Sequence, residues 1–156
     1  MNKFFIIFFS FFVLGCQANE SFLDTVRHDF ENVSFDVVEK QLEIDAELPN
    51  HIHILISKWF DQKVKINGFE GDMKFTIDEY IEEVTNINDG KRVDISLSFN
   101  VILNKPKLSQ TKLIKGSVSS YGTMSGNFSL SEFDTLIQNT QSDLVSRLSR
   151  DLRSKI

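Results

Sequence analysis

The apolar and polar positions of the chain change pattern sharply after residue 15. Residues 4–14 form an apolar run behind a single cationic residue, Lys3. A membrane-spanning helix needs about 20 apolar residues, so this run is too short to be one. A cationic start followed by a short apolar stretch is typical of a secretory signal peptide, which is removed from the mature chain. The pattern therefore predicts an exported protein.

The next stretch, residues 16–31, is mostly polar, with Phe22, Val26 and Phe30 spaced four positions apart. A short amphipathic helix would show this spacing, but a loose tether is the favoured interpretation. From residue 33 to residue 44 apolar and polar side chains alternate, which predicts a first strand.

Pro49 begins the first predicted helix, because proline at the first helical position loses no hydrogen bond. Asn67-Gly68 provides the left-handed cap expected where such a helix ends. We expect the helix to cover one face of a sheet, with Trp59 as a core residue. Its apolar stripe consists of Ile52, Leu55, Ile56, Trp59, Phe60 and Ile66.

Three runs of alternating apolar and polar residues follow, at residues 73–84, 93–103 and 112–121. The first run changes phase near Asp78-Glu79, which predicts a β-bulge. Short turns join the runs, so they predict an antiparallel meander with one face buried and one face wet. The Gly- and Ser-rich end of the third run is expected to be a mobile edge or loop.

The last element is a long C-terminal helix, which Ser129 and Glu132 begin with a Ser-x-x-Glu capping box. The pattern predicts an α+β fold in which an antiparallel sheet of about four strands packs against two helices, the longer at the C-terminus. Residues 32–156 form its single domain. The helix has an apolar face of Leu130, Phe133, Ile137, Leu144, Leu148 and Leu152 and a basic end of Arg147, Arg150, Arg153 and Lys155, as its dipole favours.

Length and charge narrow the functional classes. Removal of residues 1–15 from the 156 leaves 141 residues, the length of one domain. Of 17 basic and 22 acidic residues only Lys3 lies in the signal, so the mature chain has 16 against 22, a charge of about −6. This balance predicts no nucleic-acid partner.

The only cysteine, Cys16, directly follows Gly15 at the end of the apolar run. The ending Val13-Leu14-Gly15-Cys16 resembles a bacterial lipobox. The resemblance implies cleavage between Gly15 and Cys16 and a lipid on Cys16, labelled by palmitate, that anchors the mature chain to a membrane. Because Gln17 rather than Asp follows the cysteine, it also implies delivery to the periplasmic face of the outer membrane of a Gram-negative bacterium.

The remainder of the chain is similar to small envelope lipoproteins of proteobacteria that have no assigned activity. The likeness rests on the helix that begins at Pro49, the run Trp59-Phe60, the segment Gly68-Phe69-Glu70-Gly71, the three strands and the terminal helix. The same plan resembles, at the level of the fold, the lipopolysaccharide-assembly lipoprotein and the auxiliary lipoproteins of lipid-transport ABC systems. A fold by itself does not carry function.

Side chains capable of catalysis are present, but their spacing does not favour a catalytic arrangement. His51 and His53 lie two positions apart in a helix and diverge, so no metal site is expected. The acids between Asp78 and Glu83 alternate with apolar residues, as on a solvated strand face, which is favoured over a glycosidase-type pair. The serines of residues 117–125 do not occur in Gly-x-Ser-x-Gly. We expect no enzyme and no cofactor, and a hydrolase is the least favoured alternative.

A binding protein would use the apolar or aromatic residues near the third strand, namely Tyr80, Tyr121, Met124 and Phe128. Ordinary hairpin packing is the alternative interpretation of these residues. The sequence predicts a non-enzymatic accessory lipoprotein that supports assembly or transport at the outer membrane through an envelope protein partner. The alternative is a lipid- or glycan-binding periplasmic module, which needs an apolar cleft between sheet and helices.

Overall fold

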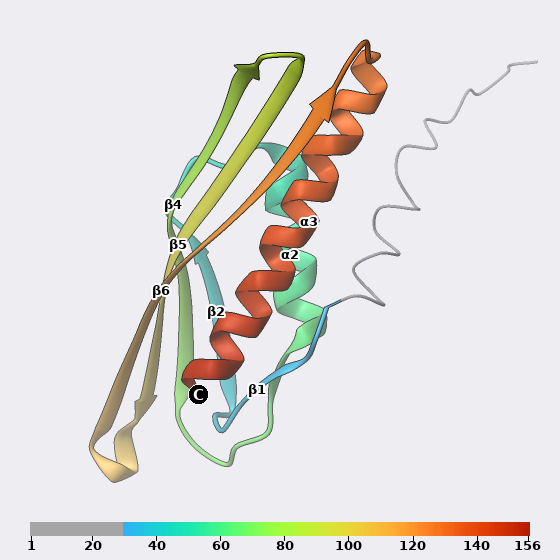
Figure 1. Ribbon diagram of the computed structural model, residues 1–156. Helices are drawn as coiled ribbons and strands as arrows, with labels where there is room; N and C mark the ends of the chain where they lie inside the picture. The colour runs from blue at the N-terminus through green and yellow to red at the C-terminus, as the bar shows by residue number, and fades with distance from the viewer. Residues whose placement is uncertain (1–29) are drawn as a thin grey trace, which may run out of the picture.

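Alternating apolar residues in the second half of the chain produce three long paired strands. The computed structural model describes residues 30–156 (Figure 1). β4 (Asp72–Ile87), β5 (Gly90–Lys105) and β6 (Gln110–Ser125) form the predicted antiparallel meander, and η1 (Pro106–Leu108) lies in the β5–β6 connection. The predicted bulge is confirmed, because the β4–β5 register shifts between Ile77 and Glu79.

The end of β6 expected as a mobile edge or loop is a regular strand, paired with β5 as far as Ser125. The four-stranded sheet has the order β2-β4-β5-β6, so β6 lies at its edge, as expected. The predicted α+β plan is confirmed, with a mostly antiparallel sheet and two helices. β2 (Glu39–Ile44) joins it in parallel with β4.

The single strand expected at residues 33–44 is two strands. β1 (Val33–Phe35) pairs in parallel with β3 (Val64–Ile66), in a separate two-stranded sheet, before the chain turns into β2. Val33, Phe35 and Val37 are all buried, because the alternation continues through the turn. The sequence pattern therefore located the buried residues but not the break between the strands.

The first helix, α2 (Asn50–Lys63), ends four residues before the predicted Asn67-Gly68 cap. The last carbonyl groups of a helix need hydrogen-bond donors from outside the helix. The ammonium group of Lys40, on β2, is such a donor. Its Nζ donates to the carbonyl oxygens of Phe60 at 2.8 Å, Asp61 at 3.1 Å and Val64 at 2.7 Å. Because α2 ends at Lys63, Ile66 lies in β3 and not on the apolar stripe of the helix.

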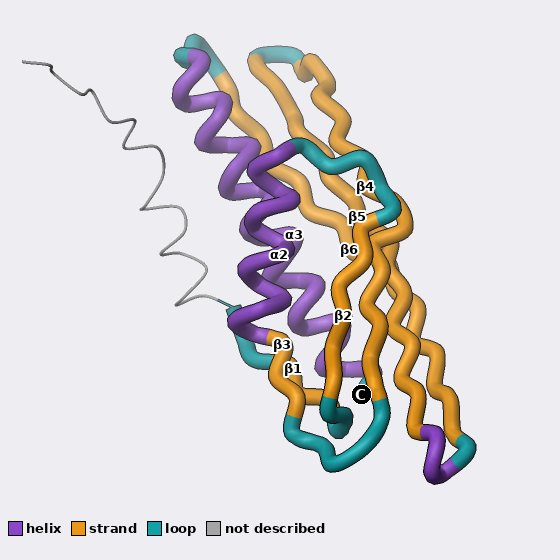
Figure 2. The backbone as a smooth tube through the Cα atoms, turned by 180° about the vertical axis from the view of Figure 1, so that it is seen from behind, coloured by secondary structure: helices purple, strands orange, loops and turns teal. Residues whose placement is uncertain are grey.

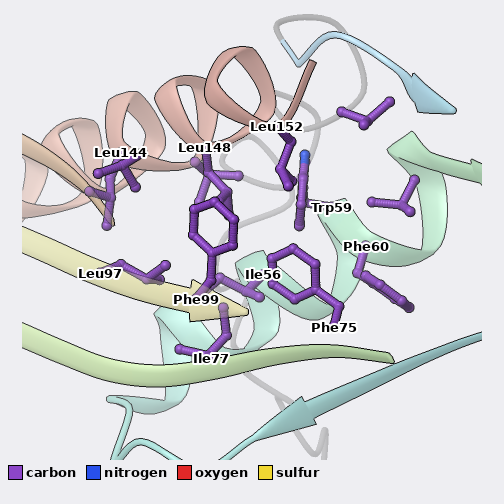
Figure 3. Packing of buried hydrophobic residues seen from close by; sticks show 14 of the residues in the cluster. Ile56, Trp59, Phe60, Phe75, Ile77, Leu97, Phe99, Leu144, Leu148 and Leu152 are labelled. Atoms are coloured by element: carbon purple, nitrogen blue, oxygen red, sulfur yellow. The ribbon is translucent and has the colours of Figure 1, made fainter. Parts of the chain in front are cut away.

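Both helices cover the same side of the four-stranded sheet, as Figure 2 shows. Aliphatic side chains and a cluster of aromatic rings fill the layer between the helices and the sheet (Figure 3). The Phe75 ring stacks on Phe99 at 5.5 Å and meets Trp59 edge-on at 5.7 Å, where distances join ring centroids. The indole Nε1 of Trp59 donates to Ser149 Oγ at 2.7 Å, which satisfies a fully buried donor and joins α2 to the C-terminal helix.

The C-terminal helix, α3 (Leu130–Lys155), begins with the predicted capping box of Ser129 and Glu132. Leu144, Leu148 and Leu152 are fully buried, but Leu130 is 84% exposed, although the pattern placed it on the apolar face. At this end of the layer Phe133 stacks on Phe128 instead, with ring centroids 6.0 Å apart.

The signal segment and most of the predicted tether lie outside the described residues. Two residues assigned to the tether contact the domain. Phe30 is buried in the core, and Glu31 forms an ion pair with Arg153 of α3.

Candidate functional site

The four residues expected to bind a partner do not share one face of the sheet. Tyr80 lies opposite the buried Leu97, so its side chain is on the helix-covered face. Met124 belongs to the same face by its register and is half-buried. Tyr121 lies opposite Asp94, on the outer face, and is 61% exposed. Phe128 lies beyond β6, half-buried against the start of α3.

Tyr80 is held inside a small polar cluster between β4 and α3. Its hydroxyl donates to Glu82, and Gln141 Nε2 donates to Glu82 Oε2 at 2.9 Å and to the Tyr80 hydroxyl at 3.2 Å. Burial, and next the bond to Glu82, raises the pKa of Tyr80 well above its ordinary value, so the hydroxyl stays protonated. These bonds join α3 to the sheet.

Tyr121 borders a shallow hollow on the outer face of the sheet. The Arg92 guanidinium lies over its ring at 4.6 Å and forms two hydrogen bonds, of 2.7 and 2.6 Å, with the Asp94 carboxylate. The hydrogen bonds from Arg92 hold the pKa of Asp94 below its ordinary value. The hollow encloses about 310 Å³ and includes Ile81, Glu83 and Ser119 in its lining.

A second hollow lies on the other side of β6, where the strand borders α3. It encloses about 440 Å³ and is lined by Val118, Ser119, Arg147, Arg150 and Asp151. We call this hollow the edge groove. Ser119 lines both hollows, so β6 separates the outer-face hollow from the edge groove.

Small residues of β6 allow α3 to approach the strand closely. A Cβ atom at Gly122 would lie 2.5 Å from Thr140 Oγ1, and one at Gly116 would lie 2.3 Å from the Phe99 ring. Such separations are shorter than real Cβ contacts, so larger residues would displace the helix or the ring. Gly122 is therefore needed for the close approach of α3, and Gly116 for the placement of the Phe99 ring.

The charges of the edge groove are only partly paired. Asp143 accepts hydrogen bonds from Ser120 Oγ and from Arg147 Nε, both at 2.7 Å. Lys155 pairs with Asp151. Arg150 is exposed and forms no ion pair or hydrogen bond with any residue of the described part of the chain. The groove therefore contains a guanidinium that is available to an anion.

Asp143 makes the stability of the domain depend on pH. Its burial alone would raise its pKa, but the bonds from Ser120 and Arg147 outweigh this and hold the pKa below the ordinary 3.8. A lowered pKa stabilises the fold above pH 3.8, and this contribution is lost as the pH falls through the folded-state pKa. We expect Asp143→Asn to lower the free energy of unfolding by about 0.5–1 kcal/mol at pH 7, because the pair is largely exposed.

The difference in free energy of unfolding between the wild type and Asp143→Asn should shrink as the pH falls below 3.8. Urea unfolding followed by tryptophan fluorescence measures it. Asp134→Asn, which removes an exposed acid from the same helix, is the control. A difference that stays constant down to about pH 2.5 would contradict the assigned ion pair.

The remaining candidates for chemistry are scattered. His51 and His53 are exposed on α2, and Asp78 accepts two 2.7 Å hydrogen bonds from Asn100 on the outer face. Ser120 is buried and donates to Asp143. Among residues 30–156 no group of three His, Cys, Asp or Glu side chains could hold a metal ion. No helix in the same range is long and apolar enough to cross a membrane.

Sequence reasoning assigned Arg147 and Arg150 to the dipole of the last helix and did not connect them with β6. Their spacing of three places them on one side of a helix. Nothing local in the sequence indicates which strand that side borders. The uncharged stretch at the end of β6 was the only sequence feature that could have indicated an open strand edge there, and it was interpreted as a sign of weak packing.

These elements together define a two-layer α+β domain in which no described helix or strand covers the outer face of the sheet. No family profile matches the sequence, and no curated protein matches it significantly. Among solved structures, a minor lipoprotein from Acinetobacter baumannii is similar, with a TM-score of 0.50 and 10% identity over 76% of this chain and 94% of that one. A candidate lipoprotein from Caulobacter crescentus has a TM-score of 0.43 and 14% identity, over 73% and 85% of the two chains.

The first of these likenesses shows the fold alone, because the identity is 10%. The chain therefore has a fold that a bacterial lipoprotein also adopts. This agrees with the coarse expectation drawn from the sequence, a lipoprotein-like α+β domain.

Proposed function

We propose that the protein is a lipid-anchored envelope lipoprotein that acts as an accessory subunit, at the outer membrane, by binding another envelope protein. Cys16 carries the lipid, residues 1–15 are the signal, and the domain of residues 32–156 makes the contact. Assembly or transport of an envelope component is the process it serves.

One observation carries the binding part of this proposal, namely that both helices lie on one side of the sheet and that no element within residues 30–156 covers the other side (Figure 2). Large apolar side chains are exposed at two places on that outer face, one at Ile102 and its cross-strand neighbour Leu113 and one near Ile81 and Tyr121, which supply the apolar contacts for a partner. They are Ile81, Ile102, Leu113 and Tyr121, exposed by 42%, 39%, 53% and 61% respectively.

The fold similarity to a bacterial lipoprotein supports the envelope part of the proposal. The sequence supports the anchor through the lipobox-like ending at Cys16. If the tether has about 15 residues, it extends at most about 50 Å, at roughly 3.3 Å per residue. The partner must therefore bind close to the membrane.

Co-purification tests the proposal. We expect the tagged full chain, expressed at native abundance and extracted from the envelope in mild detergent, to retain one envelope protein in a stoichiometric complex. A paired substitution on the outer face, Leu113→Lys with Tyr121→Lys, should reduce recovery of that protein. Exposed Ile54→Lys and Val38→Lys, away from this face, form the control. Recovery of the monomer alone with the wild-type chain would contradict the proposal.

The alternative of a lipid- or glycan-binding module required an apolar cleft between sheet and helices. That space contains the ring cluster of Trp59, Phe75 and Phe99, all fully buried (Figure 3). No observation in the described residues favours this alternative over a protein partner.

A further inference from the structure

The longest unpaired backbone in the described residues is the free edge of β6. β6 has 16 residues and pairs with β5 along its length, and no described strand pairs with its other side. In an antiparallel ladder about half of the amide and carbonyl groups of an edge strand point away from its neighbour. These groups form a template to which another extended chain can add.

The C-terminal part of this edge, residues 116–125, lacks the features by which proteins usually block strand addition. Such features are charged side chains, prolines, bulges and very short strands. Between Gly116 and Ser125 there is no charged residue and no proline, and the register with β5 is continuous. Lys112 and Lys115 protect only the N-terminal part of β6 against strand addition. The uncharged edge therefore remains open to pairing.

The edge groove beside this backbone selects for negative charge. Arg147 and Arg150 line it next to Ser119, together with the Asp151 carboxylate, which pairs with Lys155. Arg150 forms no ion pair or hydrogen bond within residues 30–156, and its charge helps to lower the pKa of Asp143. This positive charge contrasts with the net charge of −5 for the whole chain. A strand added to β6 would place alternate side chains beside α3, where acidic residues would meet the two guanidinium groups.

The same charges disfavour a second copy of this chain as the added strand. Antiparallel pairing of two β6 edges about Val118 would bring Arg147 and Arg150 of both copies close to the shared axis. Like charges placed together are destabilising. An acidic chain avoids this repulsion and gains from Arg150, which forms no ion pair with another residue of the described range 30–156.

We infer that β6 is the docking strand for an extended acidic segment of the protein partner, which adds to the sheet beside β6 and directs its acidic side chains into the edge groove. This inference rests on the proposed function, which it deepens by naming the chemistry of the partner. Backbone hydrogen bonds supply the affinity, and the two arginines supply the preference for acidic sequences.

Binding of a defined peptide to the full mature chain in detergent micelles tests the inference. The probe is a blocked ten-residue peptide of alternating Thr and Glu, compared with a Thr and Lys version. We expect the acidic peptide to bind more tightly and to slow amide hydrogen exchange within residues 116–125. A version of the acidic peptide with alternate backbone nitrogens methylated has the same charge but cannot form the ladder, so it should not bind.

Charge reversal tests the arginines. Arg147→Glu with Arg150→Glu should weaken binding of the acidic peptide by at least about tenfold. Lys58→Glu with Lys65→Glu, on α2 and β3, produces the same change in net charge and should leave binding within about twofold. Urea unfolding confirms that both variants fold. Absence of binding by the acidic peptide, equal binding of its methylated version, or formation of a dimer through β6 would each overturn the inference.

Co-purification with the edge variant separates this inference from the proposed function. If Arg147→Glu with Arg150→Glu retains the same envelope protein as the wild type, the inference fails and the function stands. If the wild type retains no protein, the proposed function fails whatever the peptide does.

Discussion

Replacing Cys16 by Ser should abolish labelling of the protein with palmitate and release it from the membrane fraction. Lipid attachment of the lipobox type needs the thiol of this residue, and no other cysteine occurs in the chain that could substitute for it. The expected products are an unprocessed precursor and a soluble periplasmic form. Metabolic labelling followed by membrane fractionation measures both effects in one experiment.

A substitution at the next position is the matched control. Gln17→Asp leaves the thiol intact, so labelling should be unchanged, while the lipobox resemblance implies retention of the labelled protein at the inner membrane. Labelling of Cys16→Ser at the wild-type level would refute the anchor. If the labelled Gln17→Asp variant stayed at the outer membrane, the proposed location would lose its support.

Phe75→Ala should destabilise the domain strongly, by more than the loss of any ion pair on its surface. The Phe75 ring is fully buried and meets three other rings, those of Trp59, Phe60 and Phe99. Truncation of a buried Phe to Ala typically costs about 3–5 kcal/mol, because it loses burial and leaves a cavity. Urea unfolding followed by the fluorescence of Trp59, the only tryptophan, measures the loss.

Phe69→Ala is the same chemical change at an exposed position. Phe69 is 97% exposed in the β3–β4 connection, so its truncation should change the free energy of unfolding by less than about 0.5 kcal/mol. Similar losses at Phe69 and Phe75 would contradict the described core.

The sequence predicted those elements whose signals are local. The alternation from Val93 to Leu103 fixes one buried face, because side chains of a strand point alternately to its two sides. The phase change near Asp78-Glu79 revealed the bulge for the same reason. Ser129 and Glu132 revealed the start of α3, because a capping box involves only residues three positions apart.

The sequence did not show which face of the sheet each candidate binding residue occupies. Tyr80 and Tyr121 have opposite surroundings, one hydrogen-bonded beneath α3 and the other exposed on the outer face. Their residue types are identical, and β6 has too few large residues for its alternation to show which side is buried. Only pairing with β5, whose faces are unambiguous, assigns Tyr121 to the outer face.

By itself the sequence determined the number of long strands, the bulge, the central part of the buried stripe of each helix and the chemical identity of the lipobox-like ending at Cys16. Tertiary structure alone decided that Lys40 binds the carbonyl groups at the end of α2, that β2 pairs in parallel with β4, and that Arg150 borders a free strand edge. The reason is physical. Local patterns encode contacts between near neighbours, whereas these three features join residues at least 20 positions apart, whose proximity depends on the packing of the whole layer.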